Sequence, residues 1–365
     1  MDIDKLLNDI NGKLHQRREP PLTDKLPQNV ARPRVANIGA GVVGLAIAWR
    51  LAARGVAVSV FDRGKAGAGA SHAAAGMLAA CCEAEPGEEA LVSLGRDSQA
   101  RWPGFADELL RASGIDVELR REGTLVLALT ADDQGEILHR LEFQKKLELP
   151  LEWLTAADTR RKEPHLAGKI AGALFSPQDH QVDNRKLVQA LRIAAEGAGA
   201  RIFEHRPVKE IAVHGGKATG VAFEDGATET ADLVVLAAGA RSRQIGGLPP
   251  DRRPPVRPVK GQMLALRMDA ASPLLDAAWR AIPAVEELPI DEIWVGHRPG
   301  SRDDAPILGP GPLEGLFYAT GHHRNGILLA PVTADAMARL ILDDVIEPAI
   351  RPFGLERFLP AQAAE

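Results

Sequence analysis

The chain has 365 residues, 45% of them hydrophobic, which is enough to bury a substantial core and predicts two domains. Its net charge of −5 excludes a general basic face, so we expect no nucleic-acid partner. Its longest apolar runs, such as residues 233–240, are far shorter than the ~20 residues of a membrane span, and no signal-peptide core is found near the start. We therefore expect a cytoplasmic protein without a membrane span.

Residues 1–33 combine an amphipathic helix pattern with a Pro-rich polar stretch, which predicts an extension or linker. The following segment, 34–63, contains an apolar strand, a glycine-rich turn, an alanine-rich helix and a second strand. About 30 residues is the length of one βαβ unit that binds a dinucleotide. Gly39 allows a sharp turn, Gly41 a close approach to a pyrophosphate, and Gly44 close packing of the helix on the strand.

Asp62 ends the second strand of this unit. A carboxylate there can accept hydrogen bonds from both ribose hydroxyls and would repel a 2′-phosphate, which favours FAD or NAD over NADP. The alternative interpretation is structural, because glycines also serve tight helix–strand packing.

A run of small residues at 67–82 would let the backbone approach a ligand closely, although tight helix packing would require the same composition. The run ends in the only two cysteines, Cys81 and Cys82. Adjacent cysteines are poorly placed for a structural disulfide and supply too few ligands for zinc. We expect buried, unreactive thiols and no metal site.

Further elements follow from periodicity and glycine turns. In chain order they are a surface-helix region at 87–114, a hairpin arm at 117–129, a bent strand at 171–182, a helix at 184–200, several short strands at 200–236, and a strand, glycine turn and long helix at 315–345. We expect that last helix to begin near Asn325. Three strands with glycine-containing ends can converge at the carboxyl edge of one parallel sheet.

The chain resembles the FAD-dependent amine and D-amino-acid oxidase family, closest to its glycine oxidase group. The motifs that carry the resemblance are GAGVVGLAIAWRLAARG with FDRG, ASHAAAGML, VDNRKLVQAL, LVVLAAGARS, RPVKGQML, WVGHRPGSRDDAPILG and GHHRNGILLAP. The resemblance implies an α/β fold in which a discontinuous, Rossmann-like FAD-binding domain carries an inserted α+β mixed-sheet substrate domain. The implied bounds are 34–82, 183–257 and 300–346 for the FAD-binding domain, 83–182 and 258–299 for the substrate domain, and 347–365 for a tail.

The resemblance implies oxidative deamination of glycine or other small amino acids, such as sarcosine or small D-amino acids. The products would be an imine or 2-oxo acid and H₂O₂ formed from O₂. A role in making the thiazole part of thiamine is also implied, and assembly into a homo-oligomer is left open.

Two arginines are implied as catalytic. Arg298, in GHRPG, matches the carboxylate-binding arginine of the family, and a guanidinium can hold a carboxylate bidentately; the alternative is a surface ion pair. Arg324 matches a second active-site arginine near the flavin, whereas His322 and His323 are interpreted as hydrogen-bonded structural histidines. The implied FAD-binding residues are Gly39, Gly41, Val43, Gly44, Asp62, Arg63, Ser71, Ala75, Gly76, Met77, Val208, Ala238, Gly239, Gly321, Arg324, Asn325, Gly326 and Ile327.

The chain departs from the family pattern between residues 275 and 276, where about 50 residues of the substrate domain, including an active-site tyrosine, are missing. Tyr318 is the single tyrosine and cannot replace it. The loss should open a sheet edge and uncover apolar surface, so we expect FAD binding to outlast catalysis. Asn37 is a second anomaly, because it places an amide in an apolar strand.

Two alternatives stay open at this point: an NAD-dependent dehydrogenase that uses only the first βαβ unit, and a truncated relative that binds FAD without catalysis. A flavin spectrum of the purified protein would reject the first alternative, and bleaching by glycine would reject the second.

Overall fold

The structure is a computed structural model that describes residues 32–266 and 289–358. The helix expected within 1–33 and the end of the C-terminal tail lie outside the described residues. None of the helices in these ranges has the length and apolar character of a membrane span.

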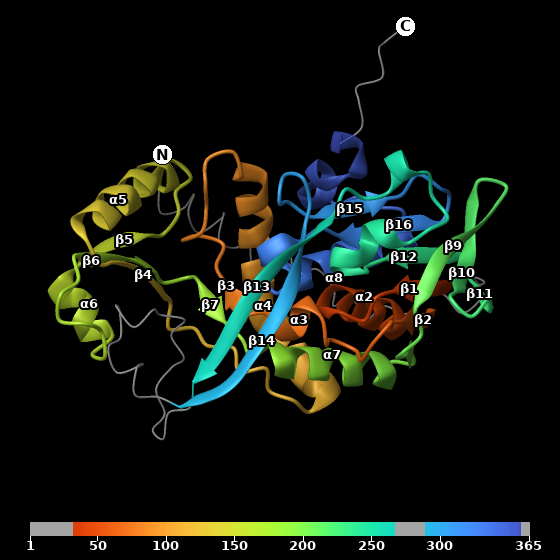
Figure 1. Ribbon diagram of the computed structural model, residues 1–365, viewed down its shortest axis with the longest axis horizontal. Coiled ribbons are helices and arrows are strands. Elements are labelled where there is room, and N and C mark those ends of the chain that lie inside the picture. The colour runs from red at the N-terminus through yellow and green to blue at the C-terminus, as the bar shows by residue number, and fades with distance from the viewer. Residues whose placement is uncertain (1–31, 267–288, 359–365) are drawn as a thin grey trace, which may run out of the picture.

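A six-stranded sheet forms the centre of the larger part of the molecule (Figure 1). Its strands lie in the order β15 (Ile307–Pro310), β16 (Leu316–Thr320), β12 (Leu233–Leu236), β1 (Arg34–Ile38), β2 (Ala57–Phe61) and β8 (Arg201–Phe203). All neighbours are parallel except β15, which runs antiparallel to β16. Because β1, β12 and β16 are adjacent and parallel, the three glycine-ended strands meet at one edge, and the expected α/β class is confirmed.

Alternation along the strands assigns their side chains to two faces of the sheet. Val35 and Val235 pack on the side of the long helices, whereas Ile38 and Leu236 pack against a small antiparallel sheet on the other side. The helices on the first side are α2 (Val42–Ala53), α4 (Glu89–Ser113), α7 (Asn184–Gly197) and α8 (Ala330–Asp343). The small sheet has the order β11 (Thr228–Thr230), β10 (Lys217–Phe223) and β9 (Val208–His214).

The helix α4 falls in the range expected for the substrate domain, yet it packs into the core of the larger part. Its Trp102 is fully buried and donates its indole N–H to the carbonyl of Leu328 (2.9 Å). The segment after α8 forms the short helices η5 (Pro348–Phe353) and η6 (Leu355–Phe358). Phe353 enters the same core as α2 and α8.

A smaller part lies at the left of Figure 1. Its antiparallel sheet has the order β4 (Thr124–Ala128), β6 (Gly172–Ser176) and β5 (Glu152–Thr155), with α5 (Ala131–Lys146) and α6 (Ala156–Lys162) packed beside it. The bent strand expected at 171–182 is found as β6 and β7 (His180–Gln181), and β7 pairs with β3 (Met77–Leu78). The prediction of a hairpin arm at 117–129 is wrong. Strand β4 covers only the second half of this range, and it pairs with β6, which is distant in the chain, rather than with an adjacent strand of a hairpin.

A long antiparallel pair, β13 (Arg257–Leu266) and β14 (Ile290–Gly300), crosses the middle of the molecule over α3 (Ala70–Ala73) (Figure 1). On one of its faces the cross-strand neighbours Leu264 and Ile293 remain 41% and 66% exposed. Uncovered apolar surface is what the missing segment leads us to expect here.

A long helix is found in this region, but the prediction that it begins near Asn325 is wrong. Residues His323–Asn325 form the 3₁₀ turn η4, and α8 starts at Ala330. Pro331 explains the difference, because it has no N–H and its ring would clash inside a helix that began at 325. In α8 it occupies the first turn, where neither property matters.

Candidate active site

An extended cleft lies at the carboxyl edge of β1, β12 and β16. It consists of two cavities of about 360 and 700 Å³ that share Gly41, Ser71 and Gly239 among their lining residues. All residues predicted for the site line this cleft except Gly44 and Gly321. The larger cavity contains Gly39, Asp62, Arg63, Val208 and Ala238, and the smaller contains Val43, Ala75, Gly76, Met77, Arg298, Arg324, Asn325, Gly326 and Ile327.

The glycine-rich turn has no space for side chains at its bends. Gly39 has a φ of +110°, and a Cβ on it would lie 2.4 Å from the carbonyl oxygen of Ala237 on the adjacent β12 edge. Gly44 does not line the cleft; a Cβ there would lie 2.0 Å from the oxygen of Gly39, so its role is close helix–strand packing. Asn37 supports the same turn, because its buried amide donates to the Gly39 oxygen (2.9 Å).

The amino end of α2 faces the cleft. Its N-cap, Gly41, has no side chain that could accept a hydrogen bond from the first N–H groups of the helix. The N–H of Val42 instead donates to Oγ of Ser71 (2.9 Å). An anion at this end would satisfy further donors. Arg63, Lys65 and Arg241 are also among the residues that line the larger cavity, and they add positive charge that would favour a pyrophosphate.

Asp62 lies where the ribose of a nucleotide is expected. Its carboxylate accepts N–H groups of Ala40 (2.8 Å) and Gly64 (2.9 Å), which fixes its position at the end of β2. Each oxygen keeps a lone pair for a further donor, such as a ribose hydroxyl. The glycine turn, the free helix end and this carboxylate therefore fit a dinucleotide such as FAD.

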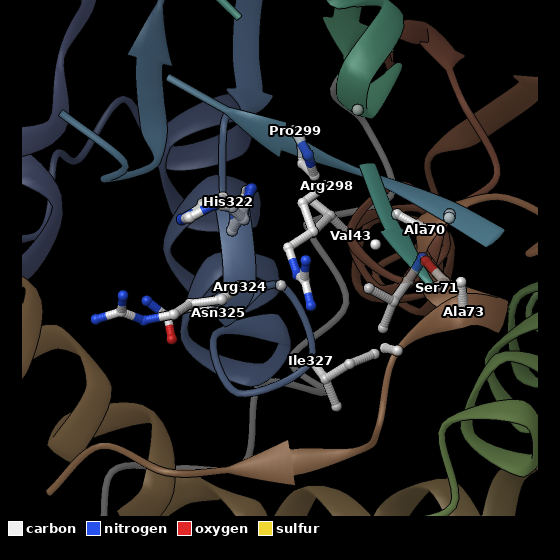
Figure 2. A pocket seen from close by; sticks show the side chains of 18 of the residues that line it. Val43, Ala70, Ser71, Ala73, Arg298, Pro299, His322, Arg324, Asn325 and Ile327 are labelled. Carbon is white, nitrogen blue, oxygen red and sulfur yellow. The ribbon is translucent and has the colours of Figure 1, made fainter. Parts of the chain in front are cut away.

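Arg298 projects from β14 into the other end of the cleft, toward Val43, Ser71 and Ile327 (Figure 2). Its guanidinium lies over Gly261 on β13, where a Cβ would come within 2.8 Å of Nη1. Among the described residues Arg298 has no hydrogen bond or ion pair. An arginine without an internal acid partner, inside a cleft, can bind a carboxylate from outside.

Arg324 has different surroundings from Arg298, and the guanidinium of Arg324 points away from Arg298 (Figure 2). It pairs with Glu83 (Nε to Oε2, 3.2 Å) and with Glu88 (Nη2 to Oε2, 3.0 Å). Burial raises the pKa of both carboxyl groups, although the nearby Arg324 charge opposes this. Arg324 is therefore already neutralised by the chain itself, which distinguishes it from Arg298 as an anchor for substrate.

His322 and His323 differ in burial and in hydrogen bonding. His322 is buried and contacts Thr333 (Nε2 to Oγ1, 3.2 Å), as expected of a structural histidine, and burial lowers its pKa to about 4. His323 lines the cleft and has no hydrogen bond among the described residues; its ring approaches the carboxylate of Asp304 (Nδ1 to Oδ1, 3.6 Å).

The cysteines are buried free thiols, as predicted, and burial raises the pKa of Cys81 to about 12. Their backbone N–H groups donate to the buried carboxylate of Asp179, at 3.0 and 2.7 Å. These bonds hold the loop that carries Glu83 into the cleft. Within the described ranges no cluster of acidic, histidine or cysteine residues could hold a metal ion.

Sequence reasoning missed several cleft residues. Gly261 had a signal, because a glycine inside a strand pattern often marks a close backbone approach. Gly296 had the same signal: a Cβ there would lie 2.3 Å from Ala73, so the glycine lets β14 approach α3. Glu83 had none, and neither did Asp304, which lines neither cavity but approaches the cleft residue His323, since an acid in a loop does not reveal its partner.

The family model described as FAD dependent oxidoreductase matches residues 34–280 and 267–340. The two matches overlap where the segment is missing. The glycine oxidase of Geobacillus kaustophilus is 33% identical over 89% of this chain and 97% of its own length. The bifunctional protein ThiO/ThiG of Synechocystis is 34% identical over 88% of this chain, which spans 53% of that protein.

Solved structures agree with these relatives. The crystal structure of glycine oxidase from Geobacillus kaustophilus has a TM-score of 0.80 and 32% identity, covering 91% of this chain and all of that one. The glycine oxidase from Bacillus cereus has a TM-score of 0.79 and 30% identity, covering 92% and 100%. The comparisons support neither the NAD-dependent dehydrogenase nor the non-catalytic protein. The chain belongs to the FAD-dependent oxidoreductase family and is an FAD-dependent amino-acid oxidase.

Proposed function

We propose that the chain catalyses the oxidative deamination of glycine or another small amino acid, such as sarcosine or a small D-amino acid. The products are the imine, which water converts to the 2-oxo acid, and H₂O₂ formed from O₂. The observation that carries the proposal is Arg298, whose guanidinium has no ion-pair partner among the described residues and lies inside the cleft at the end away from Asp62. The names of the glycine oxidase relatives support a small substrate.

Bound FAD would supply the electron acceptor that passes two electrons to O₂. The residues of this chain bind and orient the substrate. Arg298 holds the substrate carboxylate in a fixed plane, and Gly261 leaves room for the guanidinium to lie flat against β13. Glu83 and Glu88 pair with Arg324, whereas no acid in the described part of the chain pairs with Arg298. Orientation of this kind can supply much of the rate acceleration.

The test uses the FAD-loaded protein. Glycine added without O₂ should bleach the flavin absorbance, and in air glycine should yield H₂O₂. Arg298→Lys keeps the charge but loses the planar pair of donors, so kcat/KM should fall roughly 10- to 100-fold while the FAD content is unchanged. Arg302→Lys is the matched control, because Arg302 is an exposed arginine close by in the chain that does not line the cleft.

Equal rates with glycine and with methylamine, which lacks the carboxylate, would contradict the role of Arg298. A protein that is fully loaded with FAD but not bleached by any small amino acid would contradict the proposed reaction itself.

A further inference from the structure

His323 and Asp304 form a pair at the edge of the cleft that the proposed function does not use. Nδ1 of His323 and Oδ1 of Asp304 lie 3.6 Å apart, and both atoms are buried without a hydrogen bond among the described residues. His323 belongs to η4 and Asp304 to the loop after β14, and an isolated bridge between Gly300 and His322 joins the two segments. This bridge places His323 beside the strand end that carries Arg298.

Both members of the pair have an uncommon, left-handed backbone conformation. The φ angle is +54° at Asp304 and +45° at His323, in the left-handed region that L-residues other than Asn, Asp and His rarely adopt. Such a conformation persists where surrounding contacts enforce it, often at functional sites. The Asp304 loop is held from outside, because Arg357 donates to the neighbouring Asp303 (Nε to Oδ2, 2.8 Å).

Several charged groups act on the His323 ring. Arg257 on β13, Arg298 on β14 and Arg324 on η4 oppose its protonation, whereas Asp304 favours it. The charge of Asp304 also raises the pKa of Glu88, which precedes α4. Burial is the largest influence and lowers the pKa of His323. The ring is therefore neutral near pH 7. Because Nδ1 points toward the Asp304 carboxylate, a neutral ring with its proton on Nδ1 can present that proton to the carboxylate and keep a lone pair on Nε2.

We propose that Nε2 of His323 accepts a proton from the ammonium group of the bound amino acid. This inference rests on the proposed function, because an amino acid held at Arg298 enters with a charged ammonium group. One N–H bond of the substrate breaks, an Nε2–H bond forms, and the electron pair remains on the substrate nitrogen, which must be neutral for oxidation to the imine. Asp304 stabilises the resulting imidazolium, and the partly exposed ring returns the proton to water.

The test compares His323→Asn and Asp304→Asn with the unchanged holoenzyme. Asparagine tolerates positive φ, so neither substitution adds backbone strain. For His323→Asn, kcat/KM for glycine at pH 7 should fall about 100-fold, and the loss should shrink as pH rises because the free amine becomes abundant in solution. Asp304→Asn should move the acid limb of the profile to lower pH. His214→Asn, at an exposed histidine outside the cleft, should match the unchanged enzyme.

A binding measurement avoids turnover. 2-Aminoisobutyrate has no αC–H and cannot be oxidised, and isobutyrate also lacks the amino group; both can be titrated by their effect on the flavin spectrum. In the unchanged holoenzyme, affinity for 2-aminoisobutyrate should weaken as pH falls and His323 is protonated, whereas affinity for isobutyrate should not. In His323→Asn this acid weakening should be absent.

Identical 2-aminoisobutyrate curves for the unchanged protein and His323→Asn would overturn the proposal. The proposal would also be overturned if His323→Asn lowered kcat/KM by the same factor at every pH. These results leave the proposed function standing if isobutyrate still binds and glycine still yields H₂O₂. Failure of the unchanged holoenzyme to bind isobutyrate and to oxidise glycine would instead overturn the proposed function, and this inference with it.

Discussion

Gly44 and Gly41 belong to the same glycine-rich turn, and the structure predicts opposite consequences for a methyl group at each. In Gly44→Ala the added Cβ would lie 2.0 Å from the oxygen of Gly39 and 2.8 Å from Nδ2 of Asn37. Both atoms are part of the buried hydrogen bond that shapes the turn. In Gly41→Ala the nearest atom is Oγ of Ser71 at 3.3 Å, and the backbone φ of −76° suits alanine.

The magnitude for Gly44→Ala follows from three contributions. Overpacking costs about 1–3 kcal/mol, and weakening the hydrogen bond from Asn37 adds about 0.5–1.5 kcal/mol. Replacing glycine inside a helix returns about 1 kcal/mol through helix propensity. We therefore expect the free energy of unfolding of the FAD-free protein to fall by about 0.5 to 3.5 kcal/mol, because the clash outweighs the gain in helix propensity.

Gly41→Ala should leave the unfolding free energy of the FAD-free protein within about 0.5 kcal/mol of its original value. Its methyl group faces the cleft at the helix end, so the FAD dissociation constant should rise at least about tenfold, which is 1.4 kcal/mol. Urea unfolding monitored by circular dichroism gives the stabilities, and flavin fluorescence gives the binding constants. A Gly44→Ala protein as stable as the original would refute the packing argument.

Three further changes test other parts of the site. Asp62→Ala removes the acceptor of two backbone N–H groups and of the expected ribose hydroxyls, so FAD affinity should fall by about 1–3 kcal/mol in a fluorescence titration. Gly261→Ala should raise KM for glycine with little loss of stability, because its methyl group displaces only the flexible end of Arg298, and an unchanged KM would count against that contact. His322 has a folded-state pKa of about 4, below the ordinary 6.5, so unfolding free energy should fall as pH drops from about 6.5 through 4, by up to about 3 kcal/mol. In His322→Asn, urea unfolding at pH 7 and pH 4.5 should show a smaller difference than in the original protein.

Local sequence predicted much of the larger cavity, where we expect the nucleotide to bind. Strand periodicity, the three glycines and Asp62 all lie within about 30 residues, so their spacing already fixes their geometry in a βαβ unit. The glycine-ended strands β12 and β16 were also visible, because each carries its own apolar run and turn. The start of α8 was misplaced although Pro331 was in view, since a turn and a helix share the same local composition here.

Tertiary structure alone decided how the charges in the other half of the cleft are paired. Arg298 and Arg324 carry equivalent sequence signals. Arg298 lies over Gly261 with no acid partner among the described residues, whereas Arg324 is neutralised by Glu83 and Glu88, more than 230 positions away in the chain. The packing of η4 against the end of β14 brought His323 to Asp304 in the same way. Ion pairing depends on distances of a few ångströms between segments, and periodicity within a segment contains no information about those distances.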